Sequence, residues 1–136
     1  MGPLNIQPGL DGRNQSGWWV EFVEDHAPVF VSKLHWVGFD LDGTLSRTDP
    51  KLRCGPPYPL GEPVPAMIAT VKSLLDNGIS VKIFTARASE QTNISAIQDW
   101  TMRHGLGRLE VTNQKDYNLI RFFDDRAIPI TWSKGT

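Results

Sequence analysis

WVGFDLDGTL, residues 36–45, is the stretch of this sequence that decides the fold. Its first four residues are apolar almost throughout, which is typical of a strand that is buried on both faces of a sheet. This strand is predicted to end at Asp40, and a second carboxylate, Asp42, follows two residues later. A pair of acidic side chains therefore stands at the end of a buried strand.

The rest of the chain alternates between strands and helices. Further apolar strands are predicted at 81–84, 109–112 and 120–123. One helix is predicted from Pro63 to Gly78, where apolar residues recur at helical spacing, and another from Ser89 to about His104. Strands that alternate with helices predict an α/β fold with a parallel sheet.

A single domain is expected for a chain of 136 residues. Residues 1–17 are rich in Gly and Pro and are predicted to be a flexible N-terminal arm, so that the domain covers 18–136. Aromatic and β-branched runs predict extra strands within 18–35. The Pro- and Gly-rich segment 46–62 is predicted to be a loop that could serve as a small flap.

The composition excludes several classes of protein. With 15 acidic and 14 basic residues, the formal charge of −1 does not fit a strongly basic nucleic-acid binder. The only cysteine, Cys54, can form neither an internal disulfide nor a cysteine zinc site. No apolar run approaches the roughly 20 residues of a membrane helix, and the start has no hydrophobic signal core. A cytoplasmic protein is therefore expected.

Polar side chains follow each of the predicted parallel strands at the point where it ends. They are Asp40 and Asp42, Thr85, Lys115, and Asp124 with Asp125. The carboxyl ends of parallel strands share one edge of the sheet, so these groups are expected to converge there. Clustered carboxylates repel one another unless a cation neutralises them, and oxygen ligands suit Mg²⁺ above all. A magnesium ion, a lysine and a hydroxyl are together suited to binding a phosphoryl group.

These motifs resemble those of the haloacid dehalogenase (HAD) superfamily. VGFDLDGTL at 37–45 is similar to the first HAD motif, VKIFTAR at 81–87 to the second, Lys115 to the third and FFDDRA at 122–127 to the fourth. Response-regulator receiver domains use similar residues, but in them the lysine comes last in the chain. Here Lys115 precedes Asp124 and Asp125, so the order of residues does not fit a receiver domain. The resemblance covers 36 to about 130 and implies a three-layer, Rossmann-like, mostly parallel sheet with helices on both faces. Neither gap, 45–84 or 86–114, has room for a cap domain.

The resemblance also implies roles for the acidic residues. Asp40 would be the nucleophile and form an aspartyl-phosphate. Asp42 would protonate the leaving oxygen and then activate the hydrolytic water. Mg²⁺ would be held by Asp40, by the backbone carbonyl of Asp42, by Asp124, and by Asp125 either directly or through water.

Further residues would hold the phosphate. Thr85 and Lys115 would bind its non-bridging oxygens, and Gly43 permits the turn that brings the two carboxylates of the first motif to the strand end. Gly43, Thr44 and Arg87 are further candidates for contact with phosphate or substrate. The segment after Lys115 is shorter than is usual in the family, so Arg87 is the alternative cation.

The expected function is therefore a Mg²⁺-dependent phosphomonoester hydrolase without a cap. Its substrate stays open between a nucleotide, a nucleic-acid end phosphate and a phosphoprotein, although the near-neutral charge argues against long nucleic acid. A non-catalytic module that binds metal and phosphate is one alternative, and a phosphotransferase is another. An exposed strand edge within residues 1–35 could also pair between two chains.

Overall fold

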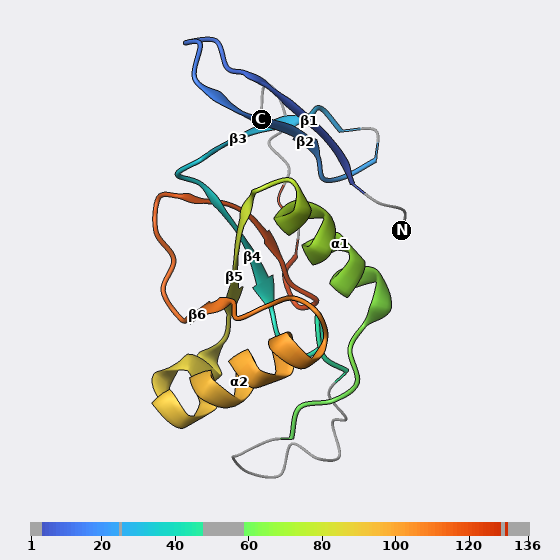
Figure 1. Cartoon of the computed structure of the whole chain (residues 1–136), viewed down its shortest axis with the longest axis vertical. Coiled ribbons are helices and arrows are strands. Elements are labelled where there is room, and N and C mark those ends of the chain that lie inside the picture. Colours follow the sequence, from blue (N-terminus) through green and yellow to red (C-terminus); the bar gives the residue numbers. More distant parts are fainter. Residues whose placement is uncertain (1–3, 25, 48–58, 129, 131–136) are drawn as a thin grey trace.

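The computed structural model describes residues 4–24, 26–47, 59–128 and 130 (Figure 1). In these residues the strands form two sheets, one of three antiparallel strands and one of four parallel strands. The helices are α1 (Pro65–Asp76), the 3₁₀ helix η2 (Ala86–Ser89) and α2 (Gln91–Arg103). None of the helices in these ranges is both long and apolar enough to cross a bilayer.

The parallel sheet has the strand order β6-β5-β4-β7. Its strands are β4 (Trp36–Asp40), β5 (Ser80–Phe84), β6 (Glu110–Thr112) and β7 (Leu119–Phe123). Residues 36–39 of β4 are all buried, as the apolar run predicted, because this strand has a neighbour on each side. Asp40 pairs with Phe84 and Phe39 with Phe123, so β4, β5 and β7 end at nearly the same level.

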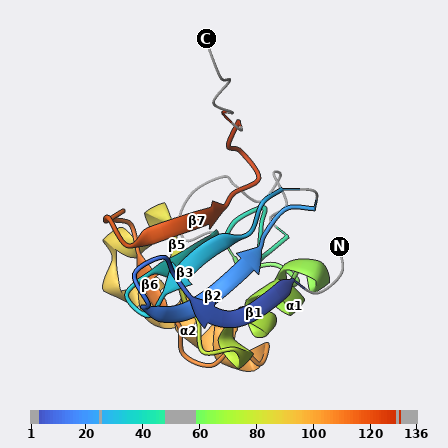
Figure 2. The same cartoon turned by 90° about the horizontal axis from the view of Figure 1, so that it is seen from above.

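Both α-helices cover one face of this sheet. The connections from β4 through α1 to β5, and from β5 through α2 to β6, step along the sheet in the same direction. Right-handed crossovers therefore place both helices on the same side, as Figure 2 shows. Val71 and Leu74 of α1 and Ile97 of α2 are buried in one core with Phe39 and Ile83 of the sheet. Burial of these apolar faces holds the two layers together.

The expected three-layer arrangement, with helices on both faces, is wrong. β7 lies on the far side of β4, and residues 113–118, which connect it to β6, contain no helix. A crossover between parallel strands that carries a helix needs about a dozen residues or more, and this connection is shorter. The fold in the described residues is a sheet-rich mixed fold with helices on a single face of the parallel sheet.

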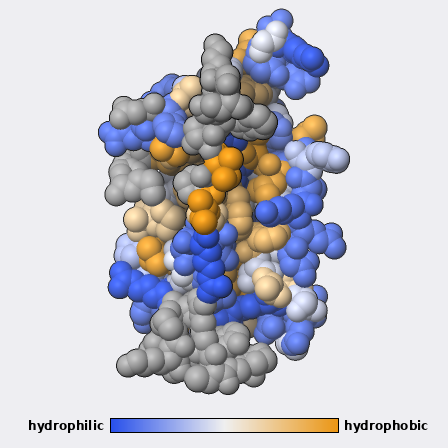
Figure 3. All heavy atoms as spheres, turned by 180° about the vertical axis from the view of Figure 1, so that it is seen from behind, coloured by the Kyte–Doolittle hydropathy of each residue, from blue (hydrophilic) through white to orange (hydrophobic). Residues whose placement is uncertain are grey.

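Side chains of the sheet and the connection cover part of the helix-free face. The indole of Trp36 donates a hydrogen bond to Asp116 at 2.8 Å, and the Lys82 ammonium lies 4.6 Å from the centre of its ring. Trp36 is consequently only 2% exposed. Viewed from behind, apolar residues are visible in the middle of the molecule, with hydrophilic residues at both sides (Figure 3).

The antiparallel sheet has the order β1-β2-β3 and lies beyond the amino ends of the parallel strands (Figure 1). Its strands are β1 (Asn5–Leu10), β2 (Ser16–Glu21) and β3 (Val29–Ser32). Val20 and Val31 are fully buried and belong to the same core as β4. Trp18 packs against Gly78, between α1 and β5, where an added Cβ atom would lie 3.4 Å from its ring. The two sheets therefore share one core.

Strand β1 occupies residues for which the sequence predicted a flexible arm. It pairs with β2 over its whole length, from Asn5 opposite Glu21 to Leu10 opposite Ser16. Pro8 is tolerated because β1 is an edge strand, where a missing N–H group leaves no ladder bond unmade. The hairpin turn is held by Asp11, whose carboxylate accepts from two backbone N–H groups at 2.8 Å.

The predicted flap at 46–62 is described only at its two ends, because 48–58 lie outside the described residues. These ends are joined to each other. The backbone N–H of Arg47 donates to the carbonyl of Glu62, and the N–H of Gly61 donates to the hydroxyl of Ser46, both at 2.8 Å. The segment that leads into α1 is thus fixed beside the turn that follows β4.

Candidate functional site

Three carboxylates lie together at the carboxyl edge of the parallel sheet. Asp40 is the last residue of β4, and Asp124 and Asp125 follow directly after β7. One carboxylate oxygen from each of the three lies within 4.8 Å of the other two. Adjacent parallel strands that end at the same level account for this convergence.

The turn after β4 brings the two strand ends close together. Gly43 has a φ of +87°, and a Cβ atom at this position would collide with the carboxylate of Asp125. The hydroxyl of the buried Thr44 accepts a hydrogen bond from the backbone N–H of Asp125 at 3.1 Å. The same oxygen lies 3.4 Å from a carboxylate oxygen of Asp40 and one of Asp125. Thr44, a candidate for contact with substrate, thus also holds the acidic residues in place.

Burial and mutual repulsion weaken the ionisation of this cluster. Burial, a hydrogen bond to Asp125 and the charges of Asp124 and Asp125 raise the pKa of Asp40 to about 7. Burial first, and then the charge of Asp125, also raise the pKa of Asp124, while the charge of Lys115 opposes this shift. A cation beside Asp40 and Asp124 would lower the pKa of both carboxyl groups.

The donor set of this cluster fits Mg²⁺. It offers oxygen atoms only, it combines three carboxylates on two strand ends, and it has no histidine or thiol in the group that would favour a softer metal. Asp40, Asp124 and Asp125 would hold the ion. Asp42, which the sequence assigned to the metal through its backbone carbonyl, does not contribute its side chain to this group.

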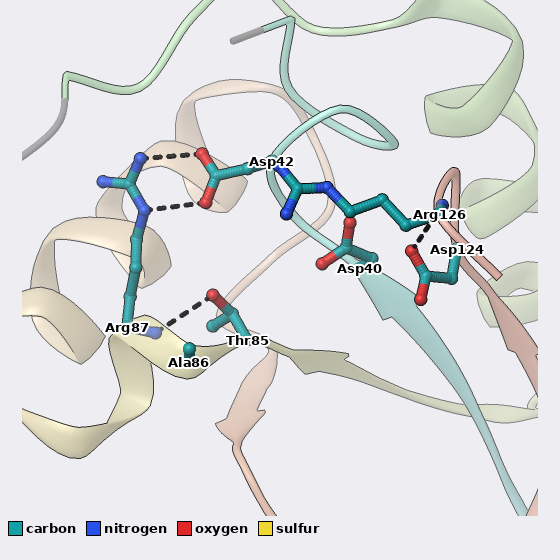
Figure 4. Close-up of a pocket in the computed structure, with 7 residues that line it drawn as sticks. All are labelled: Asp40, Asp42, Thr85, Ala86, Arg87, Asp124 and Arg126. Atoms are coloured by element: carbon teal, nitrogen blue, oxygen red, sulfur yellow. Dashed lines mark hydrogen bonds and ion pairs between the residues drawn. The ribbon is translucent and has the colours of Figure 1, made fainter. Parts of the chain in front are cut away.

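The carboxylate of Asp42 is instead held by Arg87. The Arg87 Nε donates to Asp42 Oδ2 at 2.9 Å and its Nη2 donates to Oδ1 at 2.7 Å (Figure 4). The side chains are 13% and 23% exposed respectively, so this ion pair is largely shielded from water. A planar guanidinium that binds both oxygens fixes the orientation of the carboxylate as well as its position. Arg87, the alternative phosphate-binding cation, is thus engaged by a residue of the site itself.

Thr85 connects this ion pair to the sheet. It follows β5 directly, is 4% exposed, and caps η2 by accepting a hydrogen bond from the backbone N–H of Arg87 at 3.2 Å. Its own N–H donates to the carbonyl of Thr112 at the end of β6. A hydroxyl at this point thus begins the short helix that places Arg87 opposite Asp42.

A cavity of about 340 Å³ opens in front of these residues. It is lined by Asp40, Asp42, Thr85, Ala86, Arg87, Asp124 and Arg126. Arg126 is exposed, its backbone N–H donates to Asp124 at 3.0 Å, and Figure 4 shows its side chain among the carboxylates. The sequence favours a surface or ion-pair role for Arg126 over phosphate binding, although it directly follows an acidic pair at a strand end.

Lys115 lies beside the site and is not part of the cavity lining. It belongs to the connection between β6 and β7, and its Nζ lies 5.7 and 5.5 Å from the ring centres of Phe84 and Phe122. Its charge reaches Asp124 and offsets part of the rise in the pKa of that residue. Of the predicted site residues, then, Asp40, Asp42, Thr85, Arg87 and Asp124 face one cavity. Gly43, Thr44 and Asp125 line a smaller one of about 240 Å³, which Asp124 also lines.

No protein-family model, curated protein or solved structure matches this chain. The activity of the site is therefore inferred from the chemistry of its own residues.

Proposed function

We propose that this protein is a Mg²⁺-dependent phosphomonoester hydrolase that forms an aspartyl-phosphate on Asp40. The observation that carries the proposal is the convergence of Asp40, Asp124 and Asp125 within 4.8 Å, two of which, Asp40 and Asp124, line a cavity together with Asp42. The order of the motif residues along the chain, which resembles that of the HAD superfamily, is a second support. The fold departs from that family's fold in the helix-free connection 113–118, which contains Lys115, whereas Asp40, Thr85 and Asp124 lie at the ends of their strands.

The acidic cluster would supply the metal site. Asp40, Asp124 and Asp125 would hold Mg²⁺, which when bound neutralises the charge of the phosphate and of the carboxylates around it. An anionic nucleophile can approach a phosphate dianion only when their repulsion is offset in this way. The Thr44 hydroxyl, 3.4 Å from both Asp40 and Asp125, limits the movement of these ligands.

The reaction would take place in two steps. In the first, a carboxylate oxygen of Asp40 forms a bond to phosphorus while the bond to the alcohol oxygen breaks, and Asp42 gives that oxygen a proton. In the second, Asp42 takes a proton from water, the water oxygen attacks phosphorus, and Asp40 is released as a carboxylate with inorganic phosphate. Arg87 hydrogen-bonds both oxygens of Asp42 and thereby fixes the orientation of its side chain.

Two polar groups that line the cavity would bind the phosphate oxygens. Thr85 lines the cavity and is itself almost fully buried. Arg126, which is exposed, contributes a guanidinium to the lining of the same cavity. A guanidinium can hold two phosphate oxygens at once, which suits a group whose charge is redistributed during transfer.

The test is phosphate release from para-nitrophenyl phosphate and a panel of nucleotides, phosphorylated oligonucleotides and phosphopeptides, with Mg²⁺ or with EDTA. We expect turnover that needs Mg²⁺ and is lost in Asp40→Asn. Asp76→Asn, an exposed carboxylate at the end of α1, is the matched control and should keep full activity. Release of phosphate that persists in EDTA or in Asp40→Asn would refute the proposal.

A further inference from the structure

A second cavity, of about 730 Å³, adjoins the acidic site. It lies between α2 and the segment that leads into α1. Its lining has an apolar part, with Leu60, Ala96 and Ile97, and a polar part, with Asn93, Asp99 and Arg103. Cavities of this size and mixed lining are typical of sites for small organic molecules.

Arg87 forms the common wall of the two cavities, because it lines both of them. Its side chain is 13% exposed and is held by two hydrogen bonds to Asp42. The larger cavity thus begins on the other side of the ion pair that orients the proposed acid and base. A ligand that extends from the acidic site past Asp42 would pass along Arg87 and enter it.

The proposed chemistry directs the leaving alcohol past Asp42 and toward the larger cavity. In-line displacement places the alcohol oxygen on the side of phosphorus opposite to Asp40. Asp42 must lie within hydrogen-bond reach of that oxygen to give it a proton. The alcohol part of the substrate would therefore leave the small cavity at Asp42, which lies against Arg87 (Figure 4). Arg87 also lines the larger cavity.

The charges of the larger cavity indicate what kind of alcohol fits it. The charge of Arg87 is balanced by Asp42, and Asp99 and Arg103 carry opposite charges. The lining therefore lacks the excess of positive charge with which proteins bind a nucleic-acid backbone. Apolar side chains together with the Asn93 amide suit an uncharged group that has both an apolar surface and hydrogen-bonding atoms.

The wall formed by the segment before α1 is anchored. The indole of Trp100 in α2, a residue only 2% exposed, donates to the carbonyl of Gly61 at 3.1 Å. The N–H of Val64 donates to the carbonyl of Leu45 at 2.8 Å, which ties the same segment to the turn after β4. Leu60 is therefore held at a fixed place beside α2.

From these observations we infer that the larger cavity is the binding site for the alcohol part of the substrate. The substrate is then a small-molecule phosphate monoester whose alcohol is uncharged, partly apolar and about as large as a nucleoside. This inference rests on the proposed function, and it names the class of substrate for the same site.

The test compares substrates of different size in variants that fill the larger cavity. Ala96→Trp places a large ring in it from an exposed position on α2, and Met102→Trp adds the same bulk on the helix outside it. The probes are adenosine 5′-monophosphate, methyl phosphate and a 5′-phosphorylated oligonucleotide, each with Mg²⁺. We expect Ala96→Trp to lower kcat/KM for adenosine 5′-monophosphate about tenfold or more, since blocking a site costs its binding energy. Its kcat/KM for methyl phosphate should stay unchanged, and Met102→Trp should resemble the wild type with every probe.

The inference is overturned if Ala96→Trp lowers kcat/KM equally for adenosine 5′-monophosphate and methyl phosphate, or lowers it for neither. In that case, hydrolysis of methyl phosphate that depends on Asp40 would still support the proposed function. Preference for the oligonucleotide also overturns it. Binding of adenosine, followed by the NMR signal of the Asn93 side-chain amide, provides a readout without turnover. Another outcome is that no probe is hydrolysed but adenosine still shifts the Asn93 signal in the wild type and not in Ala96→Trp. The cavity is then a binding site, and only the proposed hydrolase activity is contradicted. Absence of the shift as well overturns the inference.

Discussion

Arg87 holds Asp42 through two parallel hydrogen bonds, Nε to Oδ2 at 2.9 Å and Nη2 to Oδ1 at 2.7 Å. The two residues are 45 positions apart in the chain. Each lies just beyond the carboxyl end of its strand, Asp42 after β4 and Arg87 after β5. The pair therefore joins two neighbouring strand ends at the mouth of the cavity and fixes the carboxylate that would move protons in the proposed reaction.

Removal of this clamp is expected to reduce both stability and activity. Arg87→Ala should lower the free energy of unfolding by about 2 kcal/mol, because a hydrogen bond to a charged group contributes about 1.5–3 kcal/mol. Phosphatase kcat should fall about tenfold or more, since Asp42 loses its fixed orientation. Urea denaturation measures the first effect and steady-state kinetics the second.

Arg87→Lys separates orientation from charge. A lysine keeps the positive charge but cannot bind both oxygens of Asp42 in one plane. We expect it to restore most of the stability and little of kcat. A lysine variant with wild-type kcat would show that only the charge of Arg87 is needed.

Asp40→Asn is expected to abolish phosphate release without unfolding the protein. The amide cannot act as the nucleophile, so kcat should fall by at least about 1,000-fold, as for other groups that form covalent intermediates. The substitution also removes one charge from a cluster of three carboxylates, so the metal-free variant should be at least as stable as the wild type at pH 8. Thermal denaturation in EDTA tests this, and a large loss of stability there would contradict the repulsion that we describe.

The stability of the metal-free protein should fall as the pH rises from about 4 to about 8. The pKa of Asp40 is raised from its usual value near 4 to about 7, so between these values the folded state binds a proton that the unfolded state has released. The raised pKa of Asp124 acts in the same direction. The lowered pKa of Asp116 acts below this range and does not oppose them there.

Urea denaturation in EDTA at pH 5.5 and pH 8 measures this dependence. We expect a smaller dependence in Asp40→Asn, and an increase in stability at pH 8 when Mg²⁺ is added, because a cation favours the charged carboxylates. Equal stability of the metal-free wild type at the two pH values would contradict the prediction.

The central part of this fold could be predicted because its signals are local. An apolar run followed directly by acidic residues identifies both a buried strand and its carboxyl end, which is how Asp40 was assigned to the end of β4. The same reasoning assigned Asp124 to the end of β7, and two adjacent parallel strands then bring the two together. No long-range information was needed for this part of the site.

The remaining features depend on contacts between distant segments. Gly9 lowers strand propensity, yet in β1 it gives room to Trp19, whose ring would lie 2.9 Å from a Cβ atom there and whose Nε1 donates to the carbonyl of Leu10. The pairing of Arg87 with Asp42 depends on where η2 begins, and the place of Lys115 depends on the path of the connection 113–118. The residues next to Arg87 and Lys115 do not indicate which distant side chains these two residues meet.

Gly43→Ala is expected to destabilise the protein and weaken Mg²⁺ binding. Its φ of +87° costs an L-residue about 1–2 kcal/mol, and the added methyl group would collide with the carboxylate of Asp125. Gly107→Ala is the matched control, because Gly107 has a φ of +72° and nothing within 4 Å of a Cβ atom. We expect both variants to lose stability but only Gly43→Ala to lose metal affinity in a calorimetric titration with Mg²⁺. Equal metal affinity in the two variants would show that Asp125 is not held by this contact.

Arg126 and Lys115 are two candidates for the cation that binds phosphate, and substitution of each is expected to have a different effect. Arg126 lines the cavity with Asp40 and Asp124, whereas Lys115 lies over the rings of Phe84 and Phe122. Arg126→Gln should lower kcat/KM about 10- to 100-fold, because it removes a donor aimed at the charge that develops on the transferred group. Lys115→Gln should change kcat/KM by no more than about fivefold, the range expected for an exposed charge. Steady-state kinetics with para-nitrophenyl phosphate distinguishes the two. A larger loss in Lys115→Gln would assign the phosphate to the lysine, as the motif resemblance implies, and would leave Arg126 as a surface residue.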